Sequence, residues 1–315
     1  MQLKDKTEDE IFESVLEDNG LIKEFEKLLE DPDRDVQKKA IMVLGRIVEE
    51  NPILVEGLIP KITGFLSDSR EDIRQYSVFV VALLSEVLPD SVKPTSKSLI
   101  ALLKDKNLSI RRYAAYALAV IAEDDTGLVK EAIPVLIEFL KSEEDIIRAN
   151  AACCLALLAK GNPKLVEAYS SDFIDALEDE NAVVKANSAY ILGFIGAQAP
   201  EKVREVIPRL IGLLDSDPML RENAAYALAL IGTKDRQAIE DAVPKLLERI
   251  KDSREDVRAA SACALGATCN PNALKSLREL LKDSSVINIL HPEGKVLMAS
   301  SVSKVAEKSI KKTKS

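Results

Sequence analysis

One pattern recurs seven times along this chain at an almost constant interval. Each copy holds an acidic or hydroxyl residue, an aliphatic residue five positions later, and usually Arg or Lys directly after that. A small residue follows at four positions and a further aliphatic residue at eight. Internal repeats of about 20–50 residues are typical of solenoids and related arrays. The first aliphatic residue, position zero, falls at Val36, Ile73, Ile110, Ile147, Val184, Leu220 and Val257, so successive copies lie 36 or 37 residues apart.

The recurring positions predict two helices in each copy. Offsets 0, 4, 8 and 11 from position zero lie on one face of an α-helix, which we call helix B. A preceding apolar segment with helical spacing predicts helix A. Proline inside a helix removes one hydrogen bond and clashes with the preceding turn. We therefore expect helix A to bend or restart at Pro60, Pro134, Pro208 and Pro244.

Acidic residues before helix B and basic residues at offset one predict polar contacts between stacked hairpins. Asp before a helix can cap its N-terminus and face the positive end of its dipole. Arg at offset one can reach the Asp of its own copy or of an adjacent copy. An exposed pair contributes only about 0–1 kcal/mol, so we expect these pairs to set register while aliphatic burial stabilises the array. The acidic or hydroxyl residues, five positions before position zero, are Asp31, Asp68, Asp105, Ser142, Asp179, Asp215 and Asp252.

Both ends depart from the period, as terminal caps of an array should. Thr7 with Glu10 has the pattern of a capping box and predicts a cap helix within residues 1–16. Regular repeats occupy residues 17–283. In residues 284–315 we expect a loop over 286–294, a last helix from about Lys295 toward Ile310, and a basic tail. The whole chain, 1–315, is then one all-α solenoid domain.

Three features together resemble the HEAT repeat of the armadillo-like superfamily. They are the proline in helix A, the Asp before helix B and the Arg at offset one. The resemblance covers residues 17–283 and implies a right-handed α–α superhelix of about seven regular hairpins with terminal caps. It also implies that helix B lines the concave side and that the partners are proteins. Armadillo relatives carry an Asn at offset ten that holds a bound peptide. That ladder is missing here, because offset ten holds Arg46, Leu83, Val120, Leu157, Phe194, Leu230 and Ala267.

Offsets 2, 6 and 10 of helix B are not needed for packing, and in copies four to six they are mostly apolar or aromatic. The first copy and the last are charged nearby. An apolar centre with a polar rim is the anatomy of a protein interaction site, and Tyr is a common anchor. We predict that a helix or extended segment of a partner protein binds there. The predicted residues are Tyr116, Ile146, Asn150, Cys153, Leu157, Val183, Asn187, Tyr190, Phe194, Met219, Asn223, Tyr226 and Leu230.

The same pattern has a second interpretation. Strong curvature could bring neighbouring helices B together and bury the stripe as internal packing. The short ladder of Asn150, Asn187 and Asn223 at offset three could likewise form hydrogen bonds between adjacent repeats rather than contact a partner. Aromatic residues at offset six, Tyr116, Tyr190 and Tyr226, form a series that Phe79 in the second copy extends toward the N-terminus.

Composition excludes several classes of function. A net charge of −9 argues against a duplex-DNA binder with a broad basic face. The single His removes iron-dependent hydroxylation, which needs several His–Glu pairs, and the absence of Trp argues against excision of damaged bases. We expect no metal site and no cofactor. The four Cys, without a Cys-x-x-Cys pair, indicate buried free thiols in a reducing compartment. With no apolar leader or membrane-length apolar run, a cytoplasmic protein without membrane contact is expected.

The sequence thus favours a non-enzymatic scaffold or adaptor. HEAT-like repeats also occur in lyases that attach or detach tetrapyrroles, so an enzyme or enzyme subunit of that type stays open as the alternative. A third hypothesis is nucleic-acid association through the C-terminal lysines 311, 312 and 314. The partner's identity, the pathway and the oligomeric state are left open.

Overall fold

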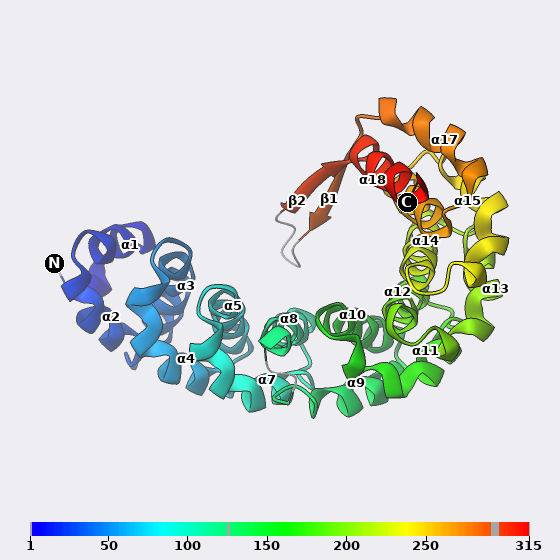
Figure 1. Ribbon diagram of the computed structural model, residues 1–315. Coiled ribbons are helices and arrows are strands. Elements are labelled where there is room, and N and C mark those ends of the chain that lie inside the picture. The colour runs from blue at the N-terminus through cyan, green and yellow to red at the C-terminus, as the bar shows by residue number, and fades with distance from the viewer. Residues whose placement is uncertain (1, 125–126, 291–295, 315) are drawn as a thin grey trace. The chain divides into compact units, whose positions relative to one another are not determined.

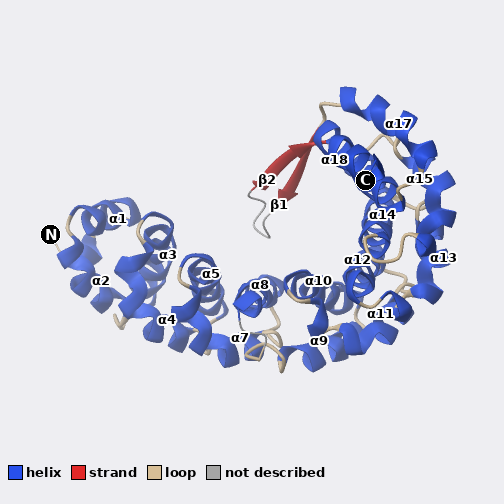
Figure 2. Ribbon diagram, in the orientation of Figure 1, coloured by secondary structure: helices blue, strands red, loops and turns tan. Residues whose placement is uncertain are grey.

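The computed structural model describes residues 2–124, 127–290 and 296–314. It is an all-helical solenoid with one added β-hairpin, as Figures 1 and 2 show. The chain forms two compact units, Met1–Val135 and Leu136–Ser315. In each unit the B helices pack side by side in one layer, and shorter A helices form the other layer.

In the first unit α1 packs on α3, α3 on α5 and α5 on α8, with the A helices against them. Short 3-10 segments link several of these helices. The helices of this unit are α1 (Glu8–Glu17), α2 (Ile22–Leu29), α3 (Arg34–Glu50), α4 (Ile59–Phe65), α5 (Glu71–Val87), α6 (Pro89–Val92), α7 (Ser96–Leu102) and α8 (Leu108–Asp124).

In the second unit the B helices α10, α12, α14 and α16 pack in sequence order, and α18 packs on α16. Helix α9 (Ala132–Leu140) spans the division between the units. The other elements are α10 (Asp145–Gly161), α11 (Ser170–Ala176), α12 (Ala182–Gln198), α13 (Ile207–Leu213), α14 (Pro218–Gly232), α15 (Val243–Arg249), α16 (Glu255–Thr268), α17 (Leu274–Glu279), β1 (Val286–Leu290), β2 (Val296–Ser301) and α18 (Val302–Lys314).

The expected restart of helix A at its internal proline is confirmed. A 3-10 segment, Pro52–Leu58, precedes α4, and Pro60 lies in the first turn of α4. Pro208 in α13 and Pro244 in α15 occupy the same position. Proline is tolerated there because the first N–H groups of a helix have no partner within it.

Small residues at offset four make the close packing of the B helices possible. All seven of these residues are at most 2% exposed. Four are Ala, and the other three are Ser77, Ser188 and Ser261. The Oγ atoms of these serines are buried and have no hydrogen-bond partner. The serines therefore fit by size, while their hydroxyls contribute nothing favourable.

The N-terminal cap is confirmed and the C-terminal one needs a correction. Thr7 and Glu10 form the capping box of α1, with the Thr7 N–H donating to the Glu10 carboxylate at 2.8 Å. At the other end, β1 and β2 pair antiparallel with Val286 opposite Ser301, where we expected a loop and then a helix from Lys295. The last helix begins at Val302. Residues 291–295, with the His-Pro-Glu-Gly sequence, lie outside the described residues.

The physical reason for the hairpin is the β-branched sequence of β1, Val-Ile-Asn-Ile-Leu, which suits a strand once a second strand can pair with it. Helix α18 then takes the place of the missing helix B against α16. Gly266 permits this approach, because a Cβ there would lie 2.7 Å from the Ser309 Cβ.

We predict that Ser188→Ala stabilises the protein. The substitution removes a buried hydroxyl without a partner and installs the residue that four other copies carry, so the free energy of unfolding should rise by about 1 kcal/mol. Urea unfolding followed by circular dichroism measures this change. Ala224→Ser is the reverse control and should lower stability by a similar amount; a stabilised Ala224→Ser protein would contradict the argument.

Candidate protein interaction site

Arginines at offset one fix four of the B helices, α5, α10, α14 and α16, to the segment that follows. The Nε of Arg74 lies 2.6 Å from Asp105 Oδ2 in the following copy, and its Nη1 donates to the Asp68 and Ser69 carbonyls of its own loop. The Arg148 guanidinium donates to both carboxylate oxygens of Asp179, at 2.7 and 3.1 Å. The acidic partner therefore lies in the following repeat. This ladder sets the register of the B helices and so positions the side chains between them.

The acidic residues act differently from the helix caps we expected. Asp179 Oδ1 accepts from the N–H of Asn181, two residues on, and Asn181 itself is the N-cap of α12. Asp105 accepts from Asn107 in the same way. Asp shapes the loop in this arrangement because its short side chain reaches the N–H two residues later, and its second oxygen stays available for Arg.

These ion pairs are more buried than exposed surface pairs. The Asp179 side chain is 12% exposed and that of Arg148 is 17% exposed. Burial alone would raise the pKa of Asp179, but the hydrogen bonds from Arg148 and from the Asn181 N–H hold it below its ordinary value. Removing one member of such a pair leaves a partly desolvated charge, which costs more than losing an exposed pair.

The ladder is interrupted in the sequence at the fourth copy, where Ser142 stands at the acidic position. Arg111, at offset one of the third copy, is only 8% exposed and donates to the carbonyls of Asp105 and Lys106. Its Nε has no partner in the described part of the chain. The division between the two compact units lies in this same stretch, after Val135.

The structure brings most of the predicted residues together on α10, α12 and α14. We call offsets 2, 6 and 10 of these helices, with the residue before position zero, the helix-B stripe. Ile146 is 61% exposed and Met219 is 36% exposed, whereas Asn150 is buried. The other predicted residues on these helices are half-buried: Cys153, Leu157, Val183, Asn187, Tyr190, Phe194, Asn223, Tyr226 and Leu230. At offset two, Ala186 is buried, whereas Ala149 and Glu222 are half-buried. Tyr116 belongs to the first unit, where its hydroxyl donates to Glu86 at 2.9 Å.

Aromatic rings form the centre of this stripe. The Tyr190 ring lies edge-on to Phe194 with centroids 4.8 Å apart, and edge-on to Tyr226 at 6.5 Å. Helices α12 and α14 approach closely, because a Cβ on Gly193 would lie 2.6 Å from the Ala227 Cα. Neighbouring helices therefore bury part of each ring and leave part accessible. Each of the two interpretations of the sequence pattern describes part of this surface.

The three asparagines differ in what they contact. Asn187 and Asn223 each donate to the carbonyl four residues earlier, at 2.8 and 2.9 Å, which is common for polar side chains inside helices. The Asn187 amide also lies 3.5 Å from Cys153 Sγ on the neighbouring helix α10. The Nδ2 of Asn150 is buried and has no partner.

Glu222, at offset two of α14, is a half-buried carboxylate in the stripe that the sequence did not single out. It lies one turn before Tyr226 on the same face of the helix. Burial raises its pKa from 4.5 to about 7, and the charge of Asp256 adds to the increase while Arg254 opposes it. The signal in the sequence was a Glu in an otherwise apolar stripe, but its burial depends on α12 and α16.

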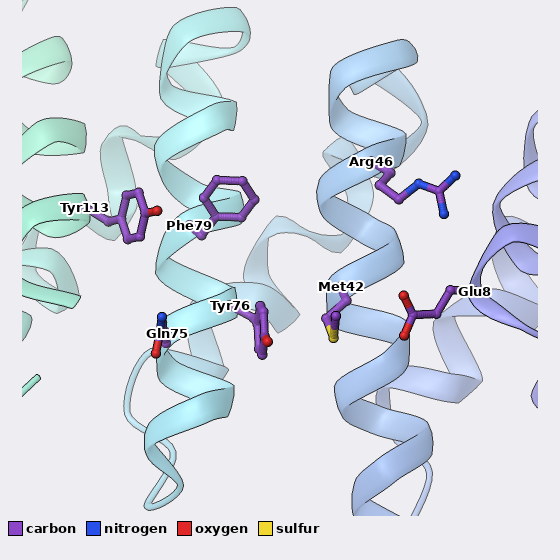
Figure 3. Close-up of a pocket in the computed structure, with 7 residues that line it drawn as sticks. All are labelled: Glu8, Met42, Arg46, Gln75, Tyr76, Phe79 and Tyr113. Carbon is purple, nitrogen blue, oxygen red and sulfur yellow. The ribbon is translucent and has the colours of Figure 1, made fainter. Parts of the chain in front are cut away.

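In the first unit, side chains at the corresponding offsets of α3 and α5 line a cavity of about 370 Å³, drawn in Figure 3. Met42 and Phe79 reach it from offset six of their helices, and Arg46 from offset ten. Arg46 is held by an ion pair with Asp9 at 2.6 Å. The Phe79 ring lies edge-on to Tyr113, with centroids 5.4 Å apart. The residues lining the cavity are Glu8, Met42, Arg46, Gln75, Tyr76, Phe79 and Tyr113.

Sequence reasoning missed this cavity, although it included Phe79 in the aromatic series. From the sequence, the charged residues of the first copy were expected to form part of the polar rim around the predicted binding site. In the structure Lys38 pairs with Asp72 at 3.3 Å and lies over the Tyr76 ring, so part of that charge is neutralised locally. The corresponding offsets of α3 and α5 therefore form a second accessible surface, in the first unit.

Neither a metal-binding group nor a membrane-spanning helix is present in the part of the chain that the structure describes. Residues 2–124, 127–290 and 296–314 hold no group of three His, Cys, Asp or Glu side chains placed to bind a metal ion. The same residues include no helix of the length and apolarity that crossing a membrane requires. All four cysteines are free thiols; Cys154 is buried, and Cys153, Cys263 and Cys269 are half-buried rather than fully buried.

The layered helices, the helix-A prolines and the Arg–Asp ladder define a HEAT-repeat protein. A family model described as Cnd1, non-SMC mitotic condensation complex subunit 1, matches residues 11–87, 77–174 and 146–281. These matches cover most of the chain, which belongs to this family. A search of curated proteins gives no match.

Two solved structures share the fold. The crystal structure of an engineered protein has a TM-score of 0.62 and 22% identity, covering 99% of this chain and 82% of that one. A crystal structure of a Kap121p mutant has a TM-score of 0.60 and 13% identity. It matches 93% of this chain, which spans only 35% of that protein. At these identities the likeness concerns the fold alone.

We predict that Asp179→Asn destabilises the protein at neutral pH. The free energy of unfolding should fall by about 1–3 kcal/mol, because Arg148 loses its bidentate partner. The pKa of Asp179 is lowered in the folded state, so its contribution is present above the unfolded value and is lost as pH falls through the folded value. Urea unfolding of both proteins between pH 7 and pH 2 should show a nearly constant difference down to about pH 4 and a shrinking difference below it, as Asp179 becomes protonated. Glu178→Gln, at an exposed pair, should change little; an equal loss there would contradict the ladder argument.

We predict the opposite pH dependence for Glu222→Gln. The folded pKa of Glu222, about 7, lies above its ordinary 4.5. The wild-type protein therefore has its full stability below pH 4.5, where this side chain is neutral, and loses stability as the pH rises through 7 and the buried side chain becomes charged. The variant should therefore be more stable than wild type at pH 8, by about 1–3 kcal/mol, and equal to it near pH 4. Thermal unfolding across this range measures both limits. A variant less stable than wild type at pH 8 would show that the carboxylate has a favourable partner.

Proposed function

We propose that this chain is a scaffold or adaptor that binds a segment of another protein along the helix-B stripe. The observation that carries the proposal is the half-exposed apolar and aromatic surface on α10, α12 and α14. Ile146 and Met219 are exposed near the starts of α10 and α14, and the Tyr190–Tyr226 pair lies farther along α12 and α14. Large exposed apolar side chains grouped with tyrosines are typical of interaction sites. In this unit the B helices lie on the inner side of its curve (Figure 1), which supports a concave site.

Family membership supports the same function. The family's description names a subunit of a mitotic condensation complex, and a subunit functions through contacts with its protein partners. We extend to this chain the binding of protein partners. The cavity among α1, α3, α5 and α8 supports a contact in the first unit as well, because it exposes aromatic and Met side chains at the corresponding positions. A cytoplasmic location is part of the proposal.

The test is a pull-down of partners from the native host with wild type and with Tyr190→Glu plus Tyr226→Glu. Two carboxylates in the aromatic centre should repel an apolar segment, so the variant should lose at least one partner. Ser171→Glu plus Gln237→Glu, at exposed A-layer positions, adds the same charge away from the stripe and should keep every partner.

Because both tyrosines are half-buried, circular dichroism and the unfolding midpoint must show that the variant is folded. Tyr190→Ser plus Tyr226→Ser provides a milder version of the same change. If folded variants of both kinds keep every partner, the stripe is not the binding surface.

A further inference from the structure

We propose that Glu222, Tyr190 and Tyr226 form a site for the cationic end of a Lys or Arg side chain carried by the protein partner. The inference rests on the proposed function, because it specifies the chemistry of the segment that the stripe binds. It concerns the second unit alone.

The first step is the unsatisfied charge of Glu222. Its carboxylate is half-buried and receives no hydrogen bond or ion pair from any residue that the structure describes. The cation that acts on it, Arg254, is already paired with Asp256 at 3.2 Å. When Glu222 is ionised, these three side chains together carry one net negative charge. Removing a carboxylate from water is unfavourable unless a cation or hydrogen-bond donors approach it, and a partner's cation would meet that need.

The second step is the pair of aromatic rings beside the carboxylate. Burial raises the pKa of Tyr190, and the negative charge of Glu222 raises it further. Burial also raises the pKa of Tyr226, to which Cys263 and then Glu222 contribute. The helix geometry agrees, because Tyr226 lies one turn after Glu222 on α14 and its ring centroid is 6.5 Å from that of Tyr190 on α12. Aromatic faces attract cations, and the attraction increases when the cation is desolvated.

The third step concerns the apolar neighbours. Met219 lies three residues before Glu222 and is 36% exposed, while Leu230 and Phe194 are half-buried farther along their helices. Lys and Arg have aliphatic stems that pack on such surfaces while the charged end reaches a carboxylate. The partner segment is therefore expected to carry a basic residue between apolar residues.

A structural role for Glu222 predicts a different outcome from a binding role. A structural residue loses stability when it is replaced, whereas a residue kept for binding can gain stability and lose affinity. Glu222→Gln preserves the shape of the side chain and removes only the charge, so one variant distinguishes the two roles.

The probe is a set of peptides selected on the full chain from a random dodecapeptide phage library. Selected peptides that bind the stripe should carry Lys or Arg next to Leu, Ile, Met or Phe. Affinity measured by fluorescence anisotropy should fall about tenfold or more with Glu222→Gln. Glu201→Gln, an exposed carboxylate in the same unit, should leave affinity unchanged. Replacing the basic residue of the peptide by norleucine should weaken binding to wild type and have no further effect on Glu222→Gln.

The outcomes separate this inference from the function on which it rests. If Tyr190→Ser plus Tyr226→Ser, which adds no charge, abolishes peptide binding but Glu222→Gln leaves it unchanged, the stripe binds proteins and the cation site is wrong. If peptide affinity is unchanged in both variants, the proposed function on this stripe fails as well. An equal loss with Glu201→Gln would show general electrostatics and would also overturn the site.

Discussion

The close approach of neighbouring B helices is the constraint on which the rest of each unit depends. Residues at offset four are Ala or Ser and are almost fully buried, so the next helix packs directly on the backbone beneath them. Gly193 permits an even closer contact with Ala227. Larger side chains at these positions would separate the helices and expose the aliphatic rows that stabilise the array.

Register between the helices depends on the Arg–Asp ladder, and register in turn decides which side chains meet on the stripe. Arg148 holds the loop before α12 through Asp179, and this places Tyr190 relative to its neighbours. The ladder is partly buried and hydrogen-bonded to loop carbonyls. It therefore contributes more to stability than the exposed pairs that sequence alone suggested, and its interruption at Ser142 coincides with the division into two units.

The close approach also explains the character of the binding surface. It buries one side of Tyr190 and Tyr226 and leaves the other side accessible, so the rings are held in place before any partner arrives. It desolvates Glu222 as well, and the cation that acts on it, Arg254, is already paired with Asp256. A binding surface that retains an unfavourable charge can recover that free energy when a complementary partner binds. In the proposed function, the HEAT-repeat architecture of the Cnd1 family provides the scaffold, and a few side chains between its helices provide the specificity.

The sequence by itself determined the repeat, the two helices of each copy, the restart of helix A at its prolines and the capping box at Thr7. These features depend on spacing and on backbone chemistry within a few residues. It also identified most residues of the stripe on α10, α12 and α14. Only the tertiary structure decided that the acidic partner of Arg148 lies in the next repeat and that β1 and β2 replace an expected loop. The cavity beside Phe79 and the burial of Glu222 were also decided there. Each of these depends on side chains that approach from other segments of the chain, and periodicity along the sequence does not contain those distances.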